Sequence, residues 1–348
     1  MPCAQTYWGM PQNRVTIADL AREAGVNKSA VSRALSGKPG VSEETRSRVL
    51  DLAHELGWRP NSTARSLSRA QSGAIGWVMR RTPKSSTVDP FAMDQLIGVQ
   101  MELSRTPYNL VLKLVDTMED ELQVYSQWHA ERRVDGILLP DLEIDDPRTA
   151  FLRERDIPMS TVADLVDFEP SDANAAAGAA DYESTGVREI MSHLLEKGHR
   201  RIGWIGGPAQ FVATRRRLDA LDAWRTRFDT VTTACTSHGP TDIAQEAVSM
   251  QDAHDLTAVV VDNELAAIET IAQLRLAGRA VPRDVSVVSW LGSDLCLLSD
   301  PTLTSLQHDI AGLGRLWTRG LLAKVYSDEP GTSTPPADPI LHARASTD

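Results

Sequence analysis

Lys28, Ser29, Ser32 and Arg33 place short polar and basic side chains at helical spacing near the start of the chain. On a helix these positions share one face, which points to solvent when the opposite face is apolar. Such a face suits the major groove of DNA: Arg33 can hold a guanine edge bidentately, and Lys28 and Ser29 can reach bases near the helix start. Ser32 can bind a phosphate. The opposite, apolar face consists of Ala30, Val31, Ala34 and Leu35.

Two helices joined by a tight turn must hold this polar face. The run TIADLAREAGVNKSAVSRAL, residues 16–35, predicts them, because Thr16 can cap the first helix with Asp19 as its capping-box partner. Gly25 ends that helix and Asn27 caps the second. Taken alone, the run is equally compatible with a surface helical hairpin whose charges are solvated. The apolar face of the first helix consists of Ile17, Leu20, Ala21 and Ala24.

A third helix completes a small helical domain. After a loop at residues 36–40, Ser42 opens this helix with two acidic residues in its first turn, where the helix dipole favours negative charge. Gly57 ends it. Three short helices with one shared core therefore account for residues 14–57. The apolar stripe of the third helix consists of Val49, Leu52, Ala53 and Leu56.

The next segment, WRPNSTARSLSRAQSG at residues 58–73, is predicted to be a hinge or linker. It has room for only about two helical turns, and so short a helix is marginal in water on its own. It therefore folds only against a partner. Leu67 is an apolar residue in polar surroundings, and is either a minor-groove wedge or a contact with the next domain. Positive charge for DNA comes from Arg59, Arg65 and Arg69.

Charge is distributed unevenly along the 348 residues, whose formal net charge is -11. Residues 1–70 hold ten Lys or Arg against six Asp or Glu, whereas the remainder holds 26 against 41. The length predicts two or three domains. A small basic head on a large acidic body suits a protein of which only the head contacts phosphates.

Several classes of protein are disfavoured by what the sequence lacks. Cys3, Cys235 and Cys296 provide neither a disulfide framework nor a CxxC metal pair, which fits a reducing compartment. We find no export signal and no run of about 18 apolar residues, so we expect a cytoplasmic protein without a membrane span, associated with the nucleoid when bound to DNA. The GxSxG, P-loop and HExxH motifs are absent, and we therefore expect no enzyme activity, no cofactor and no metal.

Residues 74–348 alternate short apolar runs with amphipathic segments, which predicts parallel sheets with helices on both faces. The alternation occurs in two sets, so we expect two α/β lobes with a ligand cleft beyond the carboxyl ends of the strands. The predicted strands are 74–79, 109–115, 136–140, 157–163, 201–206, 231–235, 258–262 and 285–290, and the predicted helices are 93–104, 119–132, 147–155, 184–197, 215–228, 242–250 and 264–277.

The run at residues 15–67 resembles, almost without interruption, the DNA-binding head and hinge helix of the lactose repressor (LacI/GalR) family. Four later runs are similar to the effector-binding core of that family, which is related to periplasmic sugar-binding proteins. They are EKGHRRIGWIGGP (196–208), TRRRLDALDAW (214–224), LAGRAVPRDVSVVSW (276–290) and DPTLTSL (300–306). The resemblance thus implies an all-α helix-turn-helix DNA-binding head followed by an α/β two-lobe, periplasmic-binding-protein-like core with parallel sheets.

The family resemblance also implies how the chain is divided. A mobile N-terminal arm (1–13) precedes the helix-turn-helix domain (14–57) and the hinge (58–73). The first lobe then comprises 74–163 and 308–326, and the second comprises 164–307 and 327–348, since helix 310–325 returns to the first lobe and PILHARA (339–345) to the second.

For the DNA-binding part, the resemblance implies three roles. Lys28, Ser29 and Arg33 read bases, and Leu67 is the wedge that enters the minor groove. The DNA backbone is contacted by Thr16, Ser32 and Asn61, with Arg65 adding charge from the hinge.

For the effector pocket, the resemblance implies a set of polar and aromatic side chains at the strand ends: Asp89, Phe91, Asp141, Arg217 and Asn263. The sequence departs from the family where an aspartate usually follows the strand at 285–290, since Leu291 stands there. Either Asp294 substitutes for that aspartate or the pocket is less polar. Trp290 either stacks on the ligand or is an ordinary buried tryptophan.

The function implied is that of a bacterial-type transcription regulator, a repressor that binds a palindromic double-stranded DNA operator as a homodimer. A small polar effector in the cleft, a sugar, controls it; the alternative effector is a nucleoside or another metabolite. The C-terminal tail has no leucine heptads, which predicts a dimer without coiled-coil tetramerisation. Two alternative classes of protein make different predictions. A pure solute-binding protein would retain all its activity after deletion of residues 1–72, and an enzyme would turn over a ligand in its 73–348 core.

Overall fold

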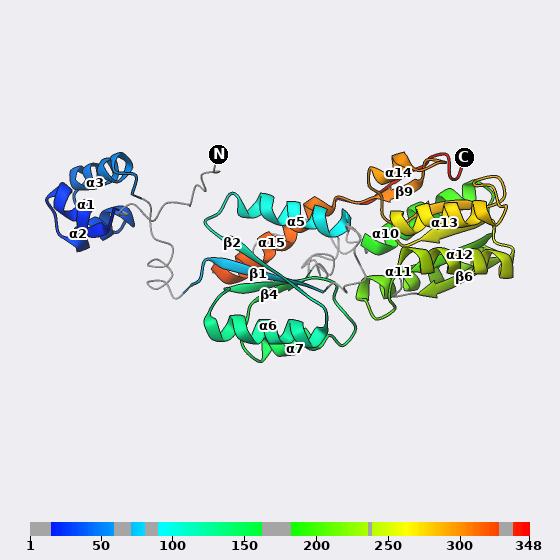
Figure 1. Cartoon of the computed structure of the whole chain (residues 1–348), viewed down its shortest axis with the longest axis horizontal. Coiled ribbons are helices and arrows are strands. Elements are labelled where there is room, and N and C mark those ends of the chain that lie inside the picture. The colour runs from blue at the N-terminus through cyan, green and yellow to red at the C-terminus, as the bar shows by residue number, and fades with distance from the viewer. Residues whose placement is uncertain (1–14, 59–70, 81–89, 162–181, 236–238, 327–336) are drawn as a thin grey trace, which may run out of the picture. The chain divides into compact units, whose positions relative to one another are not determined.

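The computed structural model describes residues 15–58, 71–80, 90–161, 182–235, 239–326 and 337–348. The chain divides into two compact units, Met1–Gln71 and Ser72–Asp348. Figure 1 shows the first as a small group of helices and the second as sheets covered by helices. In the described part of the chain, no helix is long and apolar enough to cross a membrane.

The first unit contains three helices around one apolar core: α1 (Ile17–Ala24), α2 (Lys28–Leu35) and α3 (Glu43–Glu55). The predicted caps are confirmed. The Thr16 hydroxyl and the Asp19 carboxylate form a capping box, and Gly25 takes the left-handed conformation with φ 66°. The side-chain oxygen of Asn27 accepts a hydrogen bond of 2.7 Å from the Ala30 N–H, and Ser42 caps α3 in the same way. Local sequence therefore fixes the ends of all three helices.

The second unit begins with a four-stranded parallel sheet in the order β2-β1-β3-β4. Its strands are β1 (Ala74–Arg80), β2 (Asn109–Val115), β3 (Gly136–Leu139) and β4 (Met159–Thr161). Helices α5 (Pro90–Leu103) and α15 (Ile310–Tyr326) cover one face, and α6 (Met118–Glu131) and α7 (Pro147–Arg153) cover the other (Figure 1). Successive residues of β1 show the two faces. Trp77 packs edge-on against Trp317 of α15 at 5.2 Å, whereas Gly76 lies under Trp128 of α6.

Helices α5 and α15 pack unusually closely, although more than two hundred residues separate them. A Cβ atom added at Gly98 of α5 would lie 2.0 Å from the Ala311 carbonyl oxygen. One added at Gly314 of α15 would lie 2.5 Å from the Gln95 carbonyl oxygen. The two backbones therefore touch directly, and glycine is needed on both sides of the contact. This contact fixes α15 in the lobe formed by β1–β4, which we call the N-lobe.

The remaining sheet has six strands in the order β10-β9-β8-β7-β5-β6, parallel except for β10, and we call its part of the unit the C-lobe. Its helices α10 and α11 pack on one face, with Ile202, Trp204 and Val260, and α12 and α13 pack on the other, with Ile205, Val259 and Val261. The strands are β5 (Arg201–Gly206), β6 (Thr230–Cys235), β7 (Ala258–Val261), β8 (Ser286–Ser289), β9 (Thr304–Gln307) and β10 (Ile340–His342); the helices are α10 (Tyr182–Glu196), α11 (Val212–Asp222), α12 (Pro240–His254), α13 (Glu264–Leu276) and α14 (Leu295–Leu298).

Two helix predictions were wrong in extent. The helix predicted at 215–228 begins earlier and ends at Asp222, because the chain turns through a short 3-10 helix (Arg225–Arg227) so that Phe228 can be buried. The helix predicted at 242–250 extends over Pro240–His254, since proline is well tolerated in the first turn of a helix.

Strand β9 was not predicted, because its sequence TSLQ is largely polar. The structure shows why polar residues are accepted there. The hydroxyl of Thr304 lies 2.8 Å from that of Thr347, and the Thr304 N–H donates a 2.8 Å hydrogen bond to the Ser346 hydroxyl. Residues near the C-terminal end thus satisfy the buried polar groups of β9.

Candidate effector site and DNA-reading face

The candidate effector site is centred on Arg217 of α11. Its Nε donates to Glu183 Oε2 at 2.6 Å and its Nη1 to Asp262 Oδ1 at 2.8 Å. Its guanidinium carbon lies 4.4 Å from the centroid of the Trp290 ring, a cation–π geometry. Burial disfavours the charge on Arg217, but the two carboxylates outweigh that effect and raise its pKa. The guanidinium is therefore held in one orientation and remains charged.

His308 and Tyr182 extend the site on the other side of Trp290. His308 Nε2 lies 3.0 Å from the Trp290 carbonyl oxygen, and its Nδ1 lies 2.8 Å from the Tyr182 hydroxyl. Burial lowers the pKa of His308 to about 4, against the opposing effect of the bond to Trp290, so the ring is neutral near pH 7. A carbonyl only accepts, so Nε2 carries the ring proton and the Tyr182 hydroxyl donates to Nδ1. Together with Arg217, Glu183, Asp262 and Trp290, these residues form what we call the Arg217 cluster.

The position of this cluster follows from the sheet topology. Asp262 directly follows β7, Trp290 directly follows β8, and His308 directly follows β9. These strands are adjacent and parallel, so their carboxyl ends lie at one edge of the sheet, where ligands bind in such folds. Tyr182 and Glu183 reach the same edge from the start of α10.

Two of the predicted ligand residues, Arg217 and Trp290, thus lie together. The sequence reasoning missed Tyr182, Glu183, Asp262 and His308. Asp262 ends the predicted strand 258–262, so its place at a strand end was a usable signal. No such signal marked Tyr182, Glu183 or His308. The first two lie far from Arg217 along the chain, and His308 follows β9, which was not predicted.

None of the other predicted ligand residues is a member of the Arg217 cluster, although Phe91 and Asn263 lie next to members of it. Asn263 caps α13 through a 3.0 Å bond from the Ala266 N–H, and Phe91 packs half-buried against an apolar cluster that includes Tyr182. Asp141 is exposed, with φ 46°, directly after the Pro140 that follows β3. Asp294 is exposed at the start of α14. Burial raises the pKa of Asp94 of α5, and the nearby negative charge of Asp294 raises it further. Asp89 lies outside the described residues.

A short antiparallel bridge joins the loop after β3 in the N-lobe to the segment that leads into α11. Ile144 N–H donates to the Gln210 carbonyl at 2.8 Å, and Val212 N–H donates to the Leu142 carbonyl at 2.9 Å. Because α11 carries Arg217, this bridge ties the Arg217 cluster to the N-lobe.

Buried charges support the loop on the N-lobe side. The guanidinium of Arg148, of which 1% is exposed, binds Asp146 Oδ2 at 2.6 Å and Glu121 Oε1 at 3.1 Å. Arg80, at the end of β1, pairs with Glu121 and with Glu143 of the bridging loop. We call these side chains the Arg148 network. Its polar groups pair with one another, as buried charges must.

The predicted DNA-reading face lies on α2. Lys28, Ser29, Ser32 and Arg33 are all exposed, while Val31 and Ala34 are buried against α1 and α3. Arg33 Nη1 would lie 3.3 Å from a Cβ atom at Gly40, so the arginine rests against the loop that follows α2. Thr16 is exposed at the start of α1. The remaining predicted DNA contacts, Asn61, Arg65 and Leu67, lie outside the described residues.

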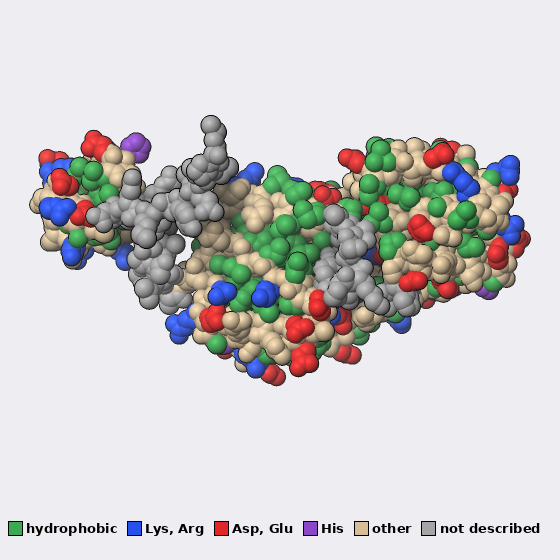
Figure 2. All heavy atoms as spheres, in the orientation of Figure 1, with side chains coloured by type: hydrophobic (Ala, Val, Ile, Leu, Met, Phe, Trp, Pro, Cys, Tyr) green, Lys and Arg blue, Asp and Glu red, His purple; other side chains and the backbone are tan. Residues whose placement is uncertain are grey.

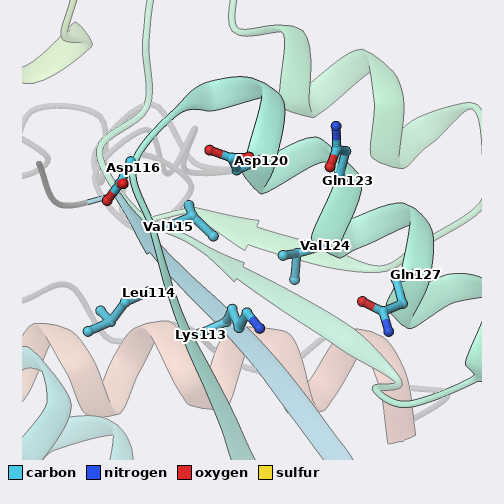
Figure 3. A pocket seen from close by; sticks show the side chains of 8 residues that line it. All are labelled: Lys113, Leu114, Val115, Asp116, Asp120, Gln123, Val124 and Gln127. Atoms are coloured by element: carbon cyan, nitrogen blue, oxygen red, sulfur yellow. The ribbon is translucent and has the colours of Figure 1, made fainter.

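A separate surface groove runs between the edge strand β2 and the helix α6 (Figure 3). None of its lining residues belongs to the Arg217 cluster, and most of them are polar: Lys113, Leu114, Val115, Asp116, Asp120, Gln123, Val124 and Gln127. Among the described residues, no group of three or more His, Cys, Asp or Glu is placed to hold a metal ion.

Comparison with known proteins fits this arrangement. Residues 16–61 match the model of the bacterial regulatory proteins of the lacI family, and residues 191–347 match a periplasmic binding protein-like domain. The HTH-type transcriptional regulator MalR of Streptomyces coelicolor is 31% identical over 350 residues, covering 95% of this chain and 96% of that protein.

Two solved structures show the same fold. A complex of the transcriptional regulator CelR with cellobiose is 26% identical, with a TM-score of 0.64 over 96% of this chain and 100% of that one. The lac repressor dimer bound to operator and the anti-inducer ONPF is 22% identical, with a TM-score of 0.73 over 96% of this chain and 99% of that one. A helix-turn-helix head and a periplasmic-binding-protein-like core define a ligand-responsive class of DNA-binding regulators. The chain belongs to the LacI family of bacterial transcriptional regulators, which are not enzymes.

Proposed function

We propose that this regulator is a cytoplasmic repressor that binds a palindromic operator as a homodimer. The observation that carries the proposal is the exposed polar face of α2, held in place by capped helices and a shared core. Lys28, Ser29 and Arg33 read bases from this face, and Thr16 and Ser32 contact the DNA backbone. The hinge residues Asn61, Arg65 and Leu67 are proposed to add contacts in the minor groove.

We propose that a small polar effector binds at the Arg217 cluster and changes DNA affinity by binding the two lobe arrangements unequally. The cluster lies at the ligand-binding edge of the C-lobe sheet, and the bridge from residues 142–144 to 210–212 links it to the N-lobe. A sugar is favoured because the similar CelR structure is a complex with cellobiose. A nucleoside or another metabolite is the second candidate, since relatives in the family include one named PurR.

An apolar surface supports the proposed homodimer. Met93, Ile97 and Met101 lie four residues apart on α5, and between 44% and 48% of each is exposed. Leu112 and Leu114 of the edge strand β2 are also exposed. Figure 2 shows hydrophobic side chains gathered over this part of the N-lobe. We call these five residues the α5–β2 face, and a surface of this kind is typical of a protein interface.

Selection of binding sites from random duplex DNA, followed by affinity measurement for Arg33→Ala, tests the DNA-binding proposal. The substitution should cost roughly 1 to 3 kcal/mol and relax the preference at one base pair. Arg48→Ala, which removes a charge from the exposed surface of α3, serves as the control and should leave that preference intact. Equal weakening by Arg33→Ala on selected and random DNA would contradict the base-reading role.

A further inference from the structure

One carboxylate holds the start of the second unit. Asp135, in the loop between α6 and β3, accepts two hydrogen bonds of 2.7 Å, one at Oδ1 from the Ser72 N–H and one at Oδ2 from the Gly73 N–H. The Asp135 N–H donates to the Ala74 carbonyl oxygen at 2.8 Å. Gly73 has φ 71°, a left-handed conformation that favours glycine. The side chain and the backbone of Asp135 therefore fix residues 72–74, where the chain enters β1.

The same carboxylate binds the last residue of α15. The Tyr326 hydroxyl donates to Asp135 Oδ2 at 2.5 Å, and its ring stacks on that of Tyr108 with the centroids 3.8 Å apart. Burial raises the pKa of Tyr326, and the bond to Asp135 raises it further, so the hydroxyl remains a donor. A Cβ atom added at Gly136 would lie 2.9 Å from Val325 Cγ2, so the end of α15 rests directly on the segment that carries Asp135.

The position of this contact links two parts of the fold. Ser72 and Gly73 end the predicted hinge segment, residues 58–73, which leads to the DNA-binding head. Helix α15 starts two residues after His308, where the chain crosses from the C-lobe, and its backbone touches that of α5. Asp135 thus connects residues 72–73, which we call the hinge base, to a helix that enters from the other lobe. Hydrogen bonds to a carboxylate are about twice as strong as those between neutral groups, which suits an anchor.

We propose, on the basis of the DNA-binding role proposed above, that Asp135 is a positioning residue for operator binding, which anchors the hinge base to the end of α15. When the first head of a dimer has bound its half-site, the second head searches within the reach of its own tether. An anchored hinge base shortens that tether and raises the effective concentration of the second head at its half-site. On a single half-site only one head binds, so the anchor changes little.

The first test measures the affinity of the full chain for two duplexes, the selected palindromic site and one half of it, at low salt. Asp135→Asn replaces one acceptor oxygen with an NH2 group, which cannot accept, so at least one of the two backbone N–H groups is released. Binding to the palindromic site should weaken at least about fivefold. Binding to the half-site should change by less than about twofold.

Tyr326→Phe separates the connection to α15 from the backbone bonds. It keeps the ring on Tyr108 and removes only the hydroxyl, so binding to the palindromic site should weaken by about twofold to fivefold. Added to Asp135→Asn, it should weaken binding no further, because the two residues act through one contact. Asp116→Asn removes a carboxylate from the exposed surface of the same lobe and should leave both affinities as in wild type.

A second measurement needs no DNA. Amide hydrogen exchange in the full chain is followed by mass spectrometry of peptides that cover Ser72 and Gly73. Asp135→Asn should raise the exchange rate of these amides at least about tenfold, because they lose their acceptor. Asp116→Asn should leave that rate unchanged. Wild-type exchange rates in Asp135→Asn would overturn the anchoring itself.

The DNA measurements can also contradict the proposal. Equal weakening on both duplexes by a folded Asp135→Asn would indicate a general loss of structure, and unchanged binding to the palindromic site would show that the anchor has no effect on DNA. Wild-type binding by Tyr326→Phe would overturn the connection to α15. This milder variant carries the same comparison of duplexes if Asp135→Asn unfolds. If wild type binds no selected duplex, the proposed function fails, and the exchange measurement still decides whether Asp135 holds the hinge base.

Discussion

The Nδ1 atom of His308 lies 2.8 Å from the hydroxyl oxygen of Tyr182. Tyr182 opens α10 of the C-lobe, whereas His308 lies between β9 and α15, where the chain passes from the C-lobe to the N-lobe. The hydrogen bond thus joins a C-lobe helix to a crossover between the lobes.

His308 should make stability depend on pH in a defined window. Its folded pKa, about 4, lies below the ordinary value of 6.5, so between these values the unfolded chain binds the proton more readily. The contribution of His308 to the free energy of unfolding is therefore fully present above pH 6.5. It is lost as the pH falls toward 4, and the loss is at most about 3 kcal/mol. Urea unfolding of wild type and His308→Gln at pH 7 and pH 4.5 measures it.

In His308→Gln, the free energy of unfolding should fall less between the two pH values than in wild type. His129→Gln, at an exposed position of α6, should keep the wild-type pH dependence. The same fall in wild type and His308→Gln would show that His308 does not titrate in this window.

Arg148→Met should destabilise the core by about 3 to 5 kcal/mol, because it leaves the buried carboxylates of Asp146 and Glu121 with less compensation. Urea unfolding measures the loss. Arg153→Met, at an exposed position of the same helix, should change stability by less than about 0.5 kcal/mol. Adding Glu121→Gln to Arg148→Met should recover part of the stability, and a double variant no more stable than Arg148→Met would argue against charge pairing as the cause.

Thr16→Ala should destabilise the helical head by about 0.5 to 2 kcal/mol, because the Asp19 N–H loses its side-chain acceptor. Thermal unfolding followed by circular dichroism of the full chain should show the head melting earlier. Thr16→Ser keeps the hydroxyl and should remain close to wild type. If alanine and serine behave alike, the cap contributes nothing measurable.

Ile97→Asp should convert the dimer into monomers by placing a charge at the centre of the α5–β2 face. Light scattering coupled to size exclusion would measure the mass, with the dimer constant weakened at least about tenfold. Ser126→Asp places the same charge on the exposed side of α6 and should leave the mass unchanged. A dimeric Ile97→Asp would place the interface elsewhere, and a monomeric wild type would contradict the proposed homodimer.

Much of the fold could be predicted because its signals are local. Thr16, Gly25 and Asn27 mark the helix ends by their own chemistry, and buried runs such as 258–262 are recognisable as strands without knowledge of their neighbours. The polar strand β9 could not be found in this way, because the groups that satisfy its polar residues, such as the Ser346 hydroxyl, lie 42 positions later in the chain.

The candidate site could be predicted only in part, for the same physical reason. Arg217 and Trp290 carry family motifs, but the charge state of the site depends on Glu183 and Asp262, which lie 34 and 45 residues from Arg217. The strand end at Asp262 was a usable signal for that residue's position, but nothing in the sequence indicates that either carboxylate contacts Arg217. The sequence predicted an arginine ready to bind a ligand, whereas the structure contains an arginine already neutralised.

The glycine contact between α5 and α15 has a mechanical consequence. Gly98 and Gly314 bring the two backbones together without intervening side chains, so the helices cannot slide past each other without a steric clash. Helix α15 starts two residues after His308, and α5 carries Met93, Ile97 and Met101. A rotation of the chain at His308 would therefore turn the apolar face of α5 through the same angle, so that a change among a few buried side chains reaches the proposed α5–β2 dimer face undiminished.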